Sequence, residues 1–335
     1  MEKSVKADTK AEYRFICVMG EGAFARVYLA EDRNGRQYAC KVSREVKLLE
    51  REAELLSGLH HPLFPAYMGY EEREGTGRLF MEYISGRNLG QMLRFRGSFS
   101  ARQTMRIARE LADGLRYLHE RQSTILYRDL KPENIMVCQD GHVRLIDFGC
   151  ACPQDMQGGE RVGTPGFAPP EQLKSGATAG VYSDVYGLGR TIRNVMAEGC
   201  DGGGKCRDQE DECHRIGERR FNRRKEYFCK GKRGNGKGKY YTGGNRCRKK
   251  EKGHHGMRNM RRRGELRHRR EEKICRRRLE QMIQAAVRDD FRQRPQDMTG
   301  ILHILTGKRE KEEGIICEKN IWESSYKNSC SLPLI

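Results

Sequence analysis

Four polar residues in the middle of the chain have the types and spacing needed to hold a metal-bound triphosphate. Asp129, Lys131 and Asn134 lie within one short stretch, and Asp147 follows soon after it. An amide oxygen beside a carboxylate suits a hard cation such as Mg²⁺, which takes few protein ligands and keeps phosphate and water oxygens. The same stretch could also position a hydroxyl group beside the phosphate.

A hairpin is expected to bring two of these residues together. Residues 135–138 and 142–146 are short apolar-rich runs, and Asp140-Gly141 between them is a strong turn signal. The outer ends of an antiparallel hairpin meet. Asn134 precedes the first strand and Asp147 follows the second, so their oxygens should converge.

The amino-terminal part reads as strands around a glycine-rich turn. Residues 13–19, 27–31 and 37–42 are the expected strands, and Gly20-Glu21-Gly22 opens the first turn. Glycine lets a backbone approach a phosphate closely because no Cβ intervenes. By itself the glycine pattern is weak and is equally typical of an ordinary hairpin. Lys41 near the end of the third strand strengthens the phosphate interpretation.

Helices are expected on both sides of a further buried strand. Residues 46–59 have leucines at helical spacing and end at His61-Pro62, and residues 79–84 read as a strand. Ser100 and Gln103 form a capping-box signal ahead of a long apolar-periodic helix.

Together these motifs resemble the eukaryotic-type Ser/Thr protein kinase superfamily. The residues that carry the resemblance are Tyr127-Arg128-Asp129-Leu130 with Asn134, the triplet Asp147-Phe148-Gly149, and the segment from Gly163 to Glu171. The resemblance departs from the usual pattern at Tyr127, where a histidine is common. It implies a two-lobed α+β fold, with a small β-rich lobe at about 13–82 and a larger helical lobe at about 83–306.

The resemblance also implies roles in ATP-dependent phosphoryl transfer. Asp129 would orient the substrate hydroxyl, Lys131 would neutralise the γ-phosphoryl group, and Asn134 and Asp147 would hold Mg²⁺, with Mn²⁺ as the alternative ion. Lys41 would contact the α- and β-phosphates and would be aimed by Glu52. Glu54 is the competing assignment for that helix carboxylate.

The implied ATP site extends over the small lobe and the connection to the large one. Adenine would meet backbone groups near Glu82 and Ile84, beside Met81. The complete expected set is Gly20, Glu21, Gly22, Val27, Ala39, Lys41, Glu52, Glu82 and Ile84.

By the same resemblance, the segment that ends at Glu171 implies protein substrates phosphorylated on Ser or Thr. Lys131 and Thr164 are typical of that class, and Glu171 is expected to pair with Arg294. Asp184 should hold the backbone of residues 127–134, here called the catalytic loop.

The resemblance also suggests how the protein is regulated through residues 147–171, here called the activation segment. No Ser, Thr or Tyr occurs between Gly149 and Gly163, so we expect no phosphorylation switch there. Asp155 or Glu160 would then neutralise Arg128 instead. Cys150 and Cys152 could form a redox switch, but inert small side chains are the better interpretation.

A basic insert at about 200–278 separates two parts of the kinase-like pattern. It has 29 Lys or Arg and 11 Asp or Glu, and so carries nearly all of the chain's net charge of +19. Its poverty in aliphatic residues predicts disorder. Three interpretations stay open: a solvated loop, an arm that binds RNA, DNA or an acidic membrane, and a zinc site built from Cys200, Cys206, Cys213, His214, Cys229 and Cys247. Residues 1–12 and 307–335 read as polar tails.

The chain has thirteen cysteines among 335 residues and no apolar run long enough to span a membrane. Residues 1–10 are polar and charged, so we expect no secretory signal. We therefore expect reduced thiols and a cytoplasmic location. The alternatives to an active protein kinase are a pseudokinase or scaffold, a small-molecule phosphotransferase, and a protein whose main role is polyanion binding.

Overall fold

The computed structural model describes residues 13–22, 24–97, 99–157, 161–174, 176, 178–197 and 254–307, without the side chains of Arg96 and of residues 254–264. The chain divides into two units, residues 1–199 with 270–335 and residues 200–269. Only residues 254–269 of the second unit are described, and they are helical. The first unit contains both expected lobes.

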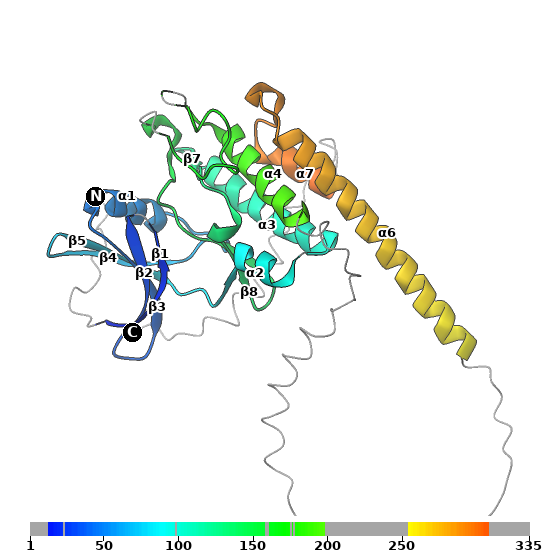
Figure 1. The fold of residues 1–335 in the computed structure, drawn as a ribbon, viewed down its shortest axis with the longest axis horizontal. Coiled ribbons are helices and arrows are strands. Elements are labelled where there is room, and N and C mark those ends of the chain that lie inside the picture. The colour runs from blue at the N-terminus through cyan, green and yellow to red at the C-terminus, as the bar shows by residue number, and fades with distance from the viewer. Residues whose placement is uncertain are drawn as a thin grey trace, which may run out of the picture. The chain divides into compact units, whose positions relative to one another are not determined.

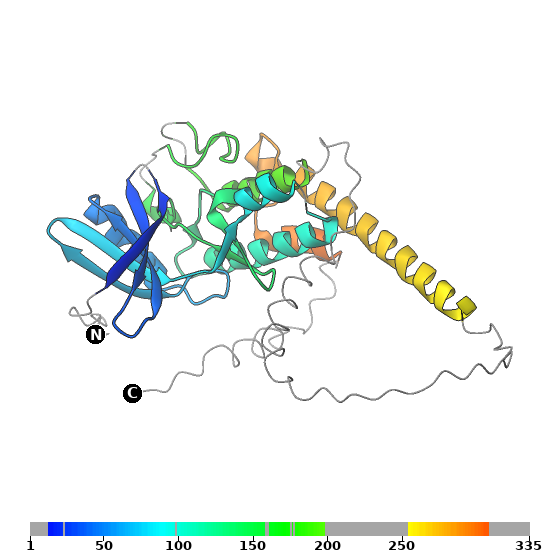
Figure 2. The same ribbon diagram turned by 60° about the horizontal axis from the view of Figure 1, so that its bottom comes forward.

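The amino-terminal lobe is built on an antiparallel sheet of five strands. They are β1 (Arg14–Glu21), β2 (Ala25–Glu31), β3 (Gln37–Ser43), β5 (Thr76–Glu82) and β4 (Tyr67–Arg73), in this order across the sheet. Figure 1 shows this sheet in blue to cyan, and Figure 2 shows it from a second side. The three strands expected around the glycine-rich turn are present.

Helix α1 (Val46–Ser57) packs on this sheet through one face. Leu49, Ala53 and Leu56 are buried at helical spacing, as the leucine pattern predicted. Glu52 lies on the same face and is only 6% exposed. A buried carboxylate needs a charged partner or hydrogen bonds, so this position must be paired.

The carboxy-terminal lobe is mainly helical, with α2 (Leu89–Arg96), α3 (Ala101–His119), α4 (Val181–Ala197), α6 (His254–Ala286) and α7 (Met298–Thr306). The capping box expected at Ser100 is present, since its side chain accepts the Gln103 N–H and the Gln103 side chain accepts the Ser100 N–H. Behind this cap, α3 buries Leu111, Leu115 and Leu118 completely against the core.

The expected hairpin is formed by β8 (Ile135–Cys138) and β9 (Val143–Leu145), which pair antiparallel, with β6 (Gly86–Asn88) on the other side of β8. Gly141 has φ +80°, the left-handed conformation that this turn requires. A smaller ladder joins β7 (Ile125–Leu126) to β10 (Cys152–Pro153). These two small sheets place residues 127–134 and 147–149 next to the ends of their strands.

The prediction of disorder is wrong for the last part of the insert, because α6 begins at His254 rather than near Leu279. Two physical effects explain the difference. Arg, Lys, Glu and Leu are good helix formers, and the buried residues Leu279, Met282 and Ala286 anchor the carboxy-terminal end of the helix in the core.

Several expectations fall outside the described residues. They concern the tails at 1–12 and beyond Gly307, the insert from 200 to 253, and its proposed zinc ligands. At the boundary, α7 ends at Thr306 and Gly307 caps it in the left-handed conformation. No helix in the described ranges is both long and apolar enough to cross a membrane.

Candidate active site

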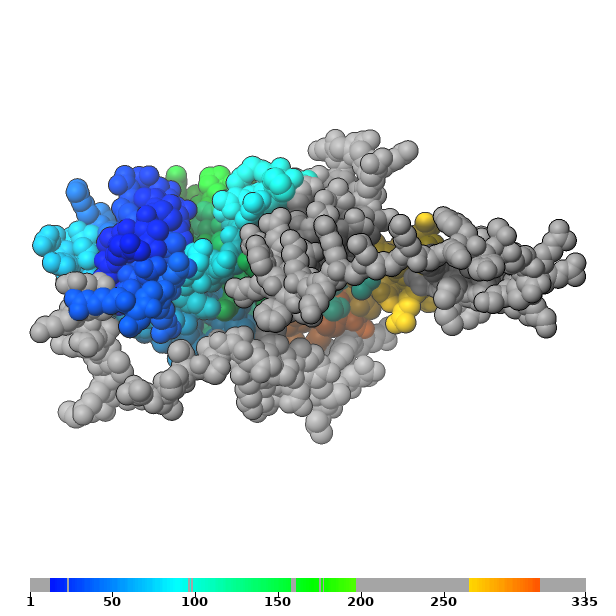
Figure 3. Space-filling view, turned by 90° about the horizontal axis from the view of Figure 1, so that it is seen from below, coloured from blue at the N-terminus to red at the C-terminus, as the bar shows by residue number. Residues whose placement is uncertain are grey.

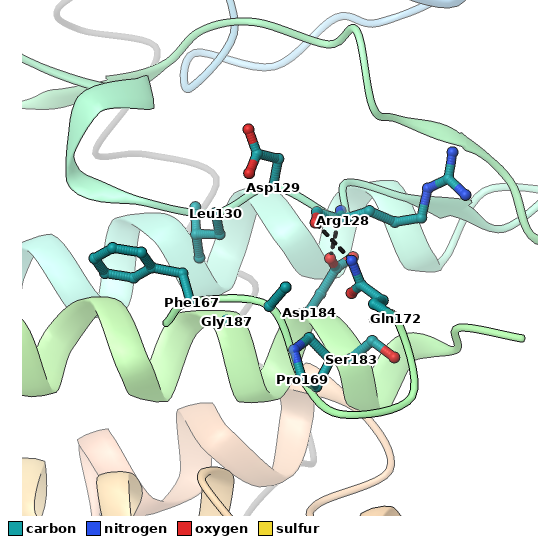
Figure 4. Close-up of a pocket in the computed structure, with 10 residues that line it drawn as sticks. Arg128, Asp129, Leu130, Phe167, Pro169, Gln172, Ser183, Asp184 and Gly187 are labelled. Carbon is teal, nitrogen blue, oxygen red and sulfur yellow. Dashed lines mark hydrogen bonds between the residues drawn. The ribbon is translucent and has the colours of Figure 1, made fainter. Parts of the chain in front are cut away.

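The catalytic loop is held from below by one buried carboxylate on α4. Asp184 accepts the backbone N–H groups of Tyr127 at 2.9 Å and Arg128 at 2.8 Å, and it contacts His119 Nε2 at 2.8 Å. Figure 4 shows Asp184 beneath the loop. Arg128 has φ +66°, a strained conformation for a residue with a side chain. The two hydrogen bonds to Asp184 stabilise that conformation, as the motif predicted.

The small cavity beneath this loop has a structural role and is too small for a substrate. It is lined by Asp184, Gln172 and their neighbours, and its free volume of about 10 Å³ is room for one water molecule. The Asp129 side chain points away from Asp184 in Figure 4. The reactive face of the loop is therefore the opposite one.

Asp129 is already engaged with a threonine hydroxyl. Its Oδ1 accepts the Thr164 hydroxyl at 2.7 Å, and its Oδ2 accepts Lys131 Nζ at 2.8 Å and Asn134 Nδ2 at 3.1 Å. Lys131 Nζ also donates to Thr164 Oγ1 at 2.8 Å. The arrangement shows that Asp129 and Lys131 can hold an aliphatic hydroxyl between an acceptor and a cation.

Lys41 joins the two lobes through two carboxylates. Its Nζ lies 2.7 Å from Glu52 Oε2 and 2.7 Å from Asp147 Oδ1. Glu52 also accepts the Phe148 N–H at 3.1 Å, so it fixes the segment that carries Asp147. The alternative, Glu54, is exposed and does not make this pair.

The charges of this triad explain the pKa shifts around it. Burial lowers the pKa of Lys41, but Glu52 and Asp147 outweigh it and raise that pKa above its usual value. Burial raises the pKa of Asp147, but the charge and hydrogen bond of Lys41 leave it below its usual value. Lys41 is thus a cation and Asp147 an anion at neutral pH.

Asn134 and Asp147 offer oxygens that fit a small hard cation. The Ile146 N–H donates to the Asn134 carbonyl at 2.9 Å, so the two ends of the hairpin meet as expected. Asn134 uses its NH₂ group on Asp129, which leaves its amide oxygen to face a ligand. The Asp147 side chain is 47% exposed and uses only Oδ1 for Lys41. One amide oxygen and one carboxylate oxygen match the few protein ligands that Mg²⁺ takes.

The expected adenine site has apolar walls and an open backbone edge. Ala39 and Met81 are cross-strand neighbours on β3 and β5, both are buried, and Val27 packs beside them. The Glu82 N–H is used by the Ala66 carbonyl at 2.9 Å. Within the described part of the chain, the backbone N–H and C=O of Ile84 have no partner, so they could receive an adenine edge.

The glycine-rich turn leaves space that no side chain of the protein needs. A Cβ at Gly20 would meet nothing within 4 Å, and at Gly22 it would make only an ordinary contact of 3.6 Å. Glu21 pairs with Arg26 across the turn at 2.7 Å. Packing within the protein therefore does not explain these glycines, and the space beside them would allow close approach of a phosphate.

The end of the activation segment is tied to the large lobe by a bidentate ion pair. Arg294 contacts Glu171 at 2.5 and 3.1 Å, which is the expected pairing. Gly163 has φ +96°, and a Cβ there would lie 2.9 Å from the Arg128 carbonyl. This close approach keeps the segment against the catalytic loop.

Two structural residues were not predicted from the sequence. Gln172 is 3% exposed and donates from Nε2 to the Arg128 carbonyl at 2.8 Å. Arg144 on β9 binds Glu82 at 2.8 Å and the carbonyls of Pro62 and Phe64. No local signal marks Gln172. Arg144 could have been suspected, because it alternates with the buried Val143 and Leu145 and so occupies the other strand face.

Comparison with known proteins identifies the group to which this architecture belongs. The model of the protein kinase domain matches residues 13–218, more than half of the chain. The chain belongs to the protein kinase family. It is 34% identical over 200 residues to mitogen-activated protein kinase kinase kinase 3 of Homo sapiens. This alignment covers 54% of this chain and 32% of that protein.

Other similar kinases come from distant organisms. A cAMP-dependent protein kinase, catalytic subunit-like, of Caenorhabditis briggsae is 34% identical over 191 residues, 54% of this chain and 49% of that protein. The probable serine/threonine-protein kinase pknA2 of Bifidobacterium longum is 34% identical over 197 residues, 54% of this chain and 26% of that protein. The matched part thus spans half or less of each of these relatives.

Proposed function

We propose that the protein transfers the γ-phosphoryl group of ATP to Ser and Thr hydroxyls of protein substrates. The observation that carries this proposal is the Thr164 hydroxyl held between Asp129 Oδ1 and Lys131 Nζ. A substrate hydroxyl in the same position would have its proton oriented by Asp129. Lys131 would place positive charge beside the transferred group, which is what this reaction mainly requires.

We assign Asn134 and Asp147 to Mg²⁺, with Mn²⁺ as the alternative ion, and Lys41 to the phosphates of ATP. The metal would neutralise phosphate charge when bound. Gly20, Glu21 and Gly22 would cover the phosphates, while Val27, Ala39, Glu82 and Ile84 would enclose the base. Glu52 would aim Lys41, as its 2.7 Å contact supports.

A pseudokinase or scaffold is less favoured, because Lys41, Glu52, Asp129, Asn134 and Asp147 are all present and mutually arranged. We also keep a cytoplasmic location as part of the proposal. The raised pKa of Cys150, caused first by burial, supports an inert thiol over a redox switch.

The decisive test is transfer of γ-phosphate to a generic Ser/Thr-containing protein by the full chain. Asp129→Ala and Asp147→Ala should each lower the rate at least about 100-fold. Asp155→Ala is the matched control, because Asp155 is an exposed acid outside the site. Equal rates in all four proteins would overturn the proposal, as would phosphate recovered only on tyrosine.

We further propose that the activation segment needs no phosphorylation between Gly149 and Gly163. Arg128 donates from Nε to the Cys150 carbonyl at 2.6 Å, and no carboxylate of the described residues pairs with it. Asp155 is exposed and does not fill that role, and Glu160 lies outside the described residues. Gln172 and Gly163 hold the segment instead. A phosphatase-treated preparation should keep its activity; recovery only after modification within 150–162 would contradict this.

One observation favours polyanion binding as a second function. Arg270, Lys273 and Arg277 are exposed on α6, on the side away from the buried Leu279, and Arg276 is exposed closer to it. Among the described residues, none of these four forms an ion pair with a carboxylate. Binding of a fluorescent RNA should weaken with salt and should weaken further when all four are changed to Gln. Salt-independent binding would exclude this function.

A further inference from the structure

We propose that Arg87, Gln91, Arg94 and Phe95, here called the α2 rim, bind an acidic group of the substrate protein. The kinase would then prefer Ser or Thr sites that have a nearby carboxylate or phosphate. This inference rests on the proposed kinase function and adds a substrate class to it.

The α2 rim is an open hollow of about 430 Å³ beside β6 and α2. Arg87 belongs to β6, and the other three residues belong to α2. The α2 surface is exposed on the face shown in Figure 3, where α2 appears in cyan. Phe95 is 78% exposed, so its ring is accessible at the surface.

Phe95 positions a cation without neutralising it. The guanidinium of Arg87 lies over the Phe95 ring, 5.1 Å from its centroid. A cation–π contact restricts the side chain but leaves the positive charge and the in-plane N–H donors available. An arginine prepared in this way can bind a carboxylate or phosphate through two parallel hydrogen bonds.

Positive charge exceeds negative charge in the α2 rim. In the described part of the chain, no carboxylate lies within ion-pair distance of Arg87. Arg94 faces Glu133 at 3.8 Å, and both side chains are about half exposed or more, so this pair contributes little.

Three other exposed arginines have closer acidic partners. Arg14, Arg26 and Arg116 contact acidic partners at 3.0, 2.7 and 2.7 Å. The α2 rim differs from these three pairs, because it has one loosely held anion for two cations.

The α2 rim is attached to the catalytic loop. Glu133 lies in the short turn Pro132–Asn134, between Lys131 and Asn134. A Cβ at Gly90 would lie 2.7 Å from Glu133 Oε1, so the first turn of α2 is packed directly against this carboxylate. A capping box between Asn88 and Gln91 fixes where α2 starts. A substrate hydroxyl at Asp129 would thus bring its flanking residues toward the α2 rim.

The charge arrangement decides which flanking residues are accepted. Glu133 alone would attract a basic substrate residue, but Arg94 offsets that carboxylate and Arg87 adds a second cation. Peptides with Arg or Lys at the position that contacts the α2 rim would be repelled by these two arginines. Peptides with Asp, Glu or a phosphorylated residue would gain a charge-assisted hydrogen bond.

The test uses the full chain and one neutral Ser-containing peptide, into which a single Asp, phosphoserine or Arg is placed at each of four positions on either side. The measured quantity is the KM of the neutral peptide divided by that of the substituted one. We expect one position at which Asp raises this ratio about 5- to 10-fold and Arg lowers it. A benefit from phosphoserine alone would support a phosphate ligand, and a benefit from both would support any anion.

Variants then locate the effect. In the double variant Arg87→Gln/Arg94→Gln the ratio should fall to about one, whereas Glu133→Gln should raise it by removing the competing anion. Arg14→Gln is the matched control and should keep the ratio of the wild type. The melting temperature of each variant verifies folding.

Two results would overturn the inference: the same KM for acidic, neutral and basic peptides at every position, or an acid preference that survives the double variant. Failure of the proposed function itself would look different, because the wild type would then phosphorylate neither the peptides nor a generic protein.

Discussion

Two ion pairs of this kinase each join a basic residue to a glutamate, but the two pairs have different surroundings. Arg294, with a fully buried side chain, uses its donors on both oxygens of Glu171 and on the carbonyls of Arg288 and Asp289, and it stacks over the Tyr186 ring. Lys41 instead faces two carboxylates, and one of them, Asp147, is 47% exposed. In the first pair all the hydrogen-bonding groups of the arginine are in use. The second pair has one more negative than positive charge, and the Asp147 carboxylate is partly exposed to solvent.

The difference separates a structural pair from a reactive one. A saturated pair has no capacity for a ligand, so its loss should affect stability. An unbalanced pair with an exposed oxygen can accept a metal or a phosphate, so its loss should affect phosphoryl transfer. The following variants test this division.

The largest effect is expected for Arg294→Leu. It leaves Glu171 largely buried without its counter-charge and should lower the free energy of unfolding by about 3–5 kcal/mol. Chemical denaturation measures it. Arg292→Leu is the control, because Arg292 is an exposed neighbour and should change stability by less than about 0.5 kcal/mol. Equal losses in both variants would contradict a structural role for the pair.

Lys41→Met should mainly remove activity. The two carboxylates would lose their shared cation, and the phosphates of ATP would lose a contact, so kcat/KM should fall by about 100- to 1,000-fold. Steady-state kinetics at saturating peptide measures it. Lys47→Met, at the start of α1, is the control. A stability loss as large as that of Arg294→Leu, with activity retained, would reverse the two assignments.

Arg144→Gln tests a connection between the two lobes. Arg144 binds Glu82 at 2.8 Å and the Phe64 carbonyl at 3.1 Å, and losing these partners should cost about 1–3 kcal/mol of stability. The KM for ATP should rise as well, since we assign Glu82 to the adenine site. Thermal unfolding and ATP titration check the two parts. Arg73→Gln on β4 serves as the reference variant.

A smaller effect is expected from pH on Lys41→Met. Burial raises the pKa of Glu52 in the folded protein, and Lys41 normally opposes that shift. Without Lys41 the folded-state pKa should rise further, so protonation stabilises the variant at low pH and this benefit is lost as pH rises. The melting-temperature deficit against wild type should therefore be smaller at pH 5 than at pH 8. A deficit that grows on acidification would be inconsistent with a buried neutral Glu52.

Much of the fold could be predicted because its signals are local. Asp140-Gly141 predicted the β8–β9 hairpin, and Ser100 with Gln103 predicted the start of α3, since both depend on neighbouring residues. The extent of α6 was missed because aliphatic poverty indicates little core burial but does not exclude a helix anchored at one end. The neighbourhood of Arg87 and Phe95 was missed because it joins β6 to α2.

By itself, the sequence indicated which residues could bind a metal-bound triphosphate, because motif spacing is a property of neighbours, and its resemblance to protein kinases implied a fold of two lobes. The tertiary structure decided that Glu52, and not Glu54, reaches Lys41, that Gln172 supports the catalytic loop, and that the α2 rim has excess positive charge. Those outcomes depend on which side chains meet across long sequence distances, and only packing determines such meetings and the burial that gives them their energies.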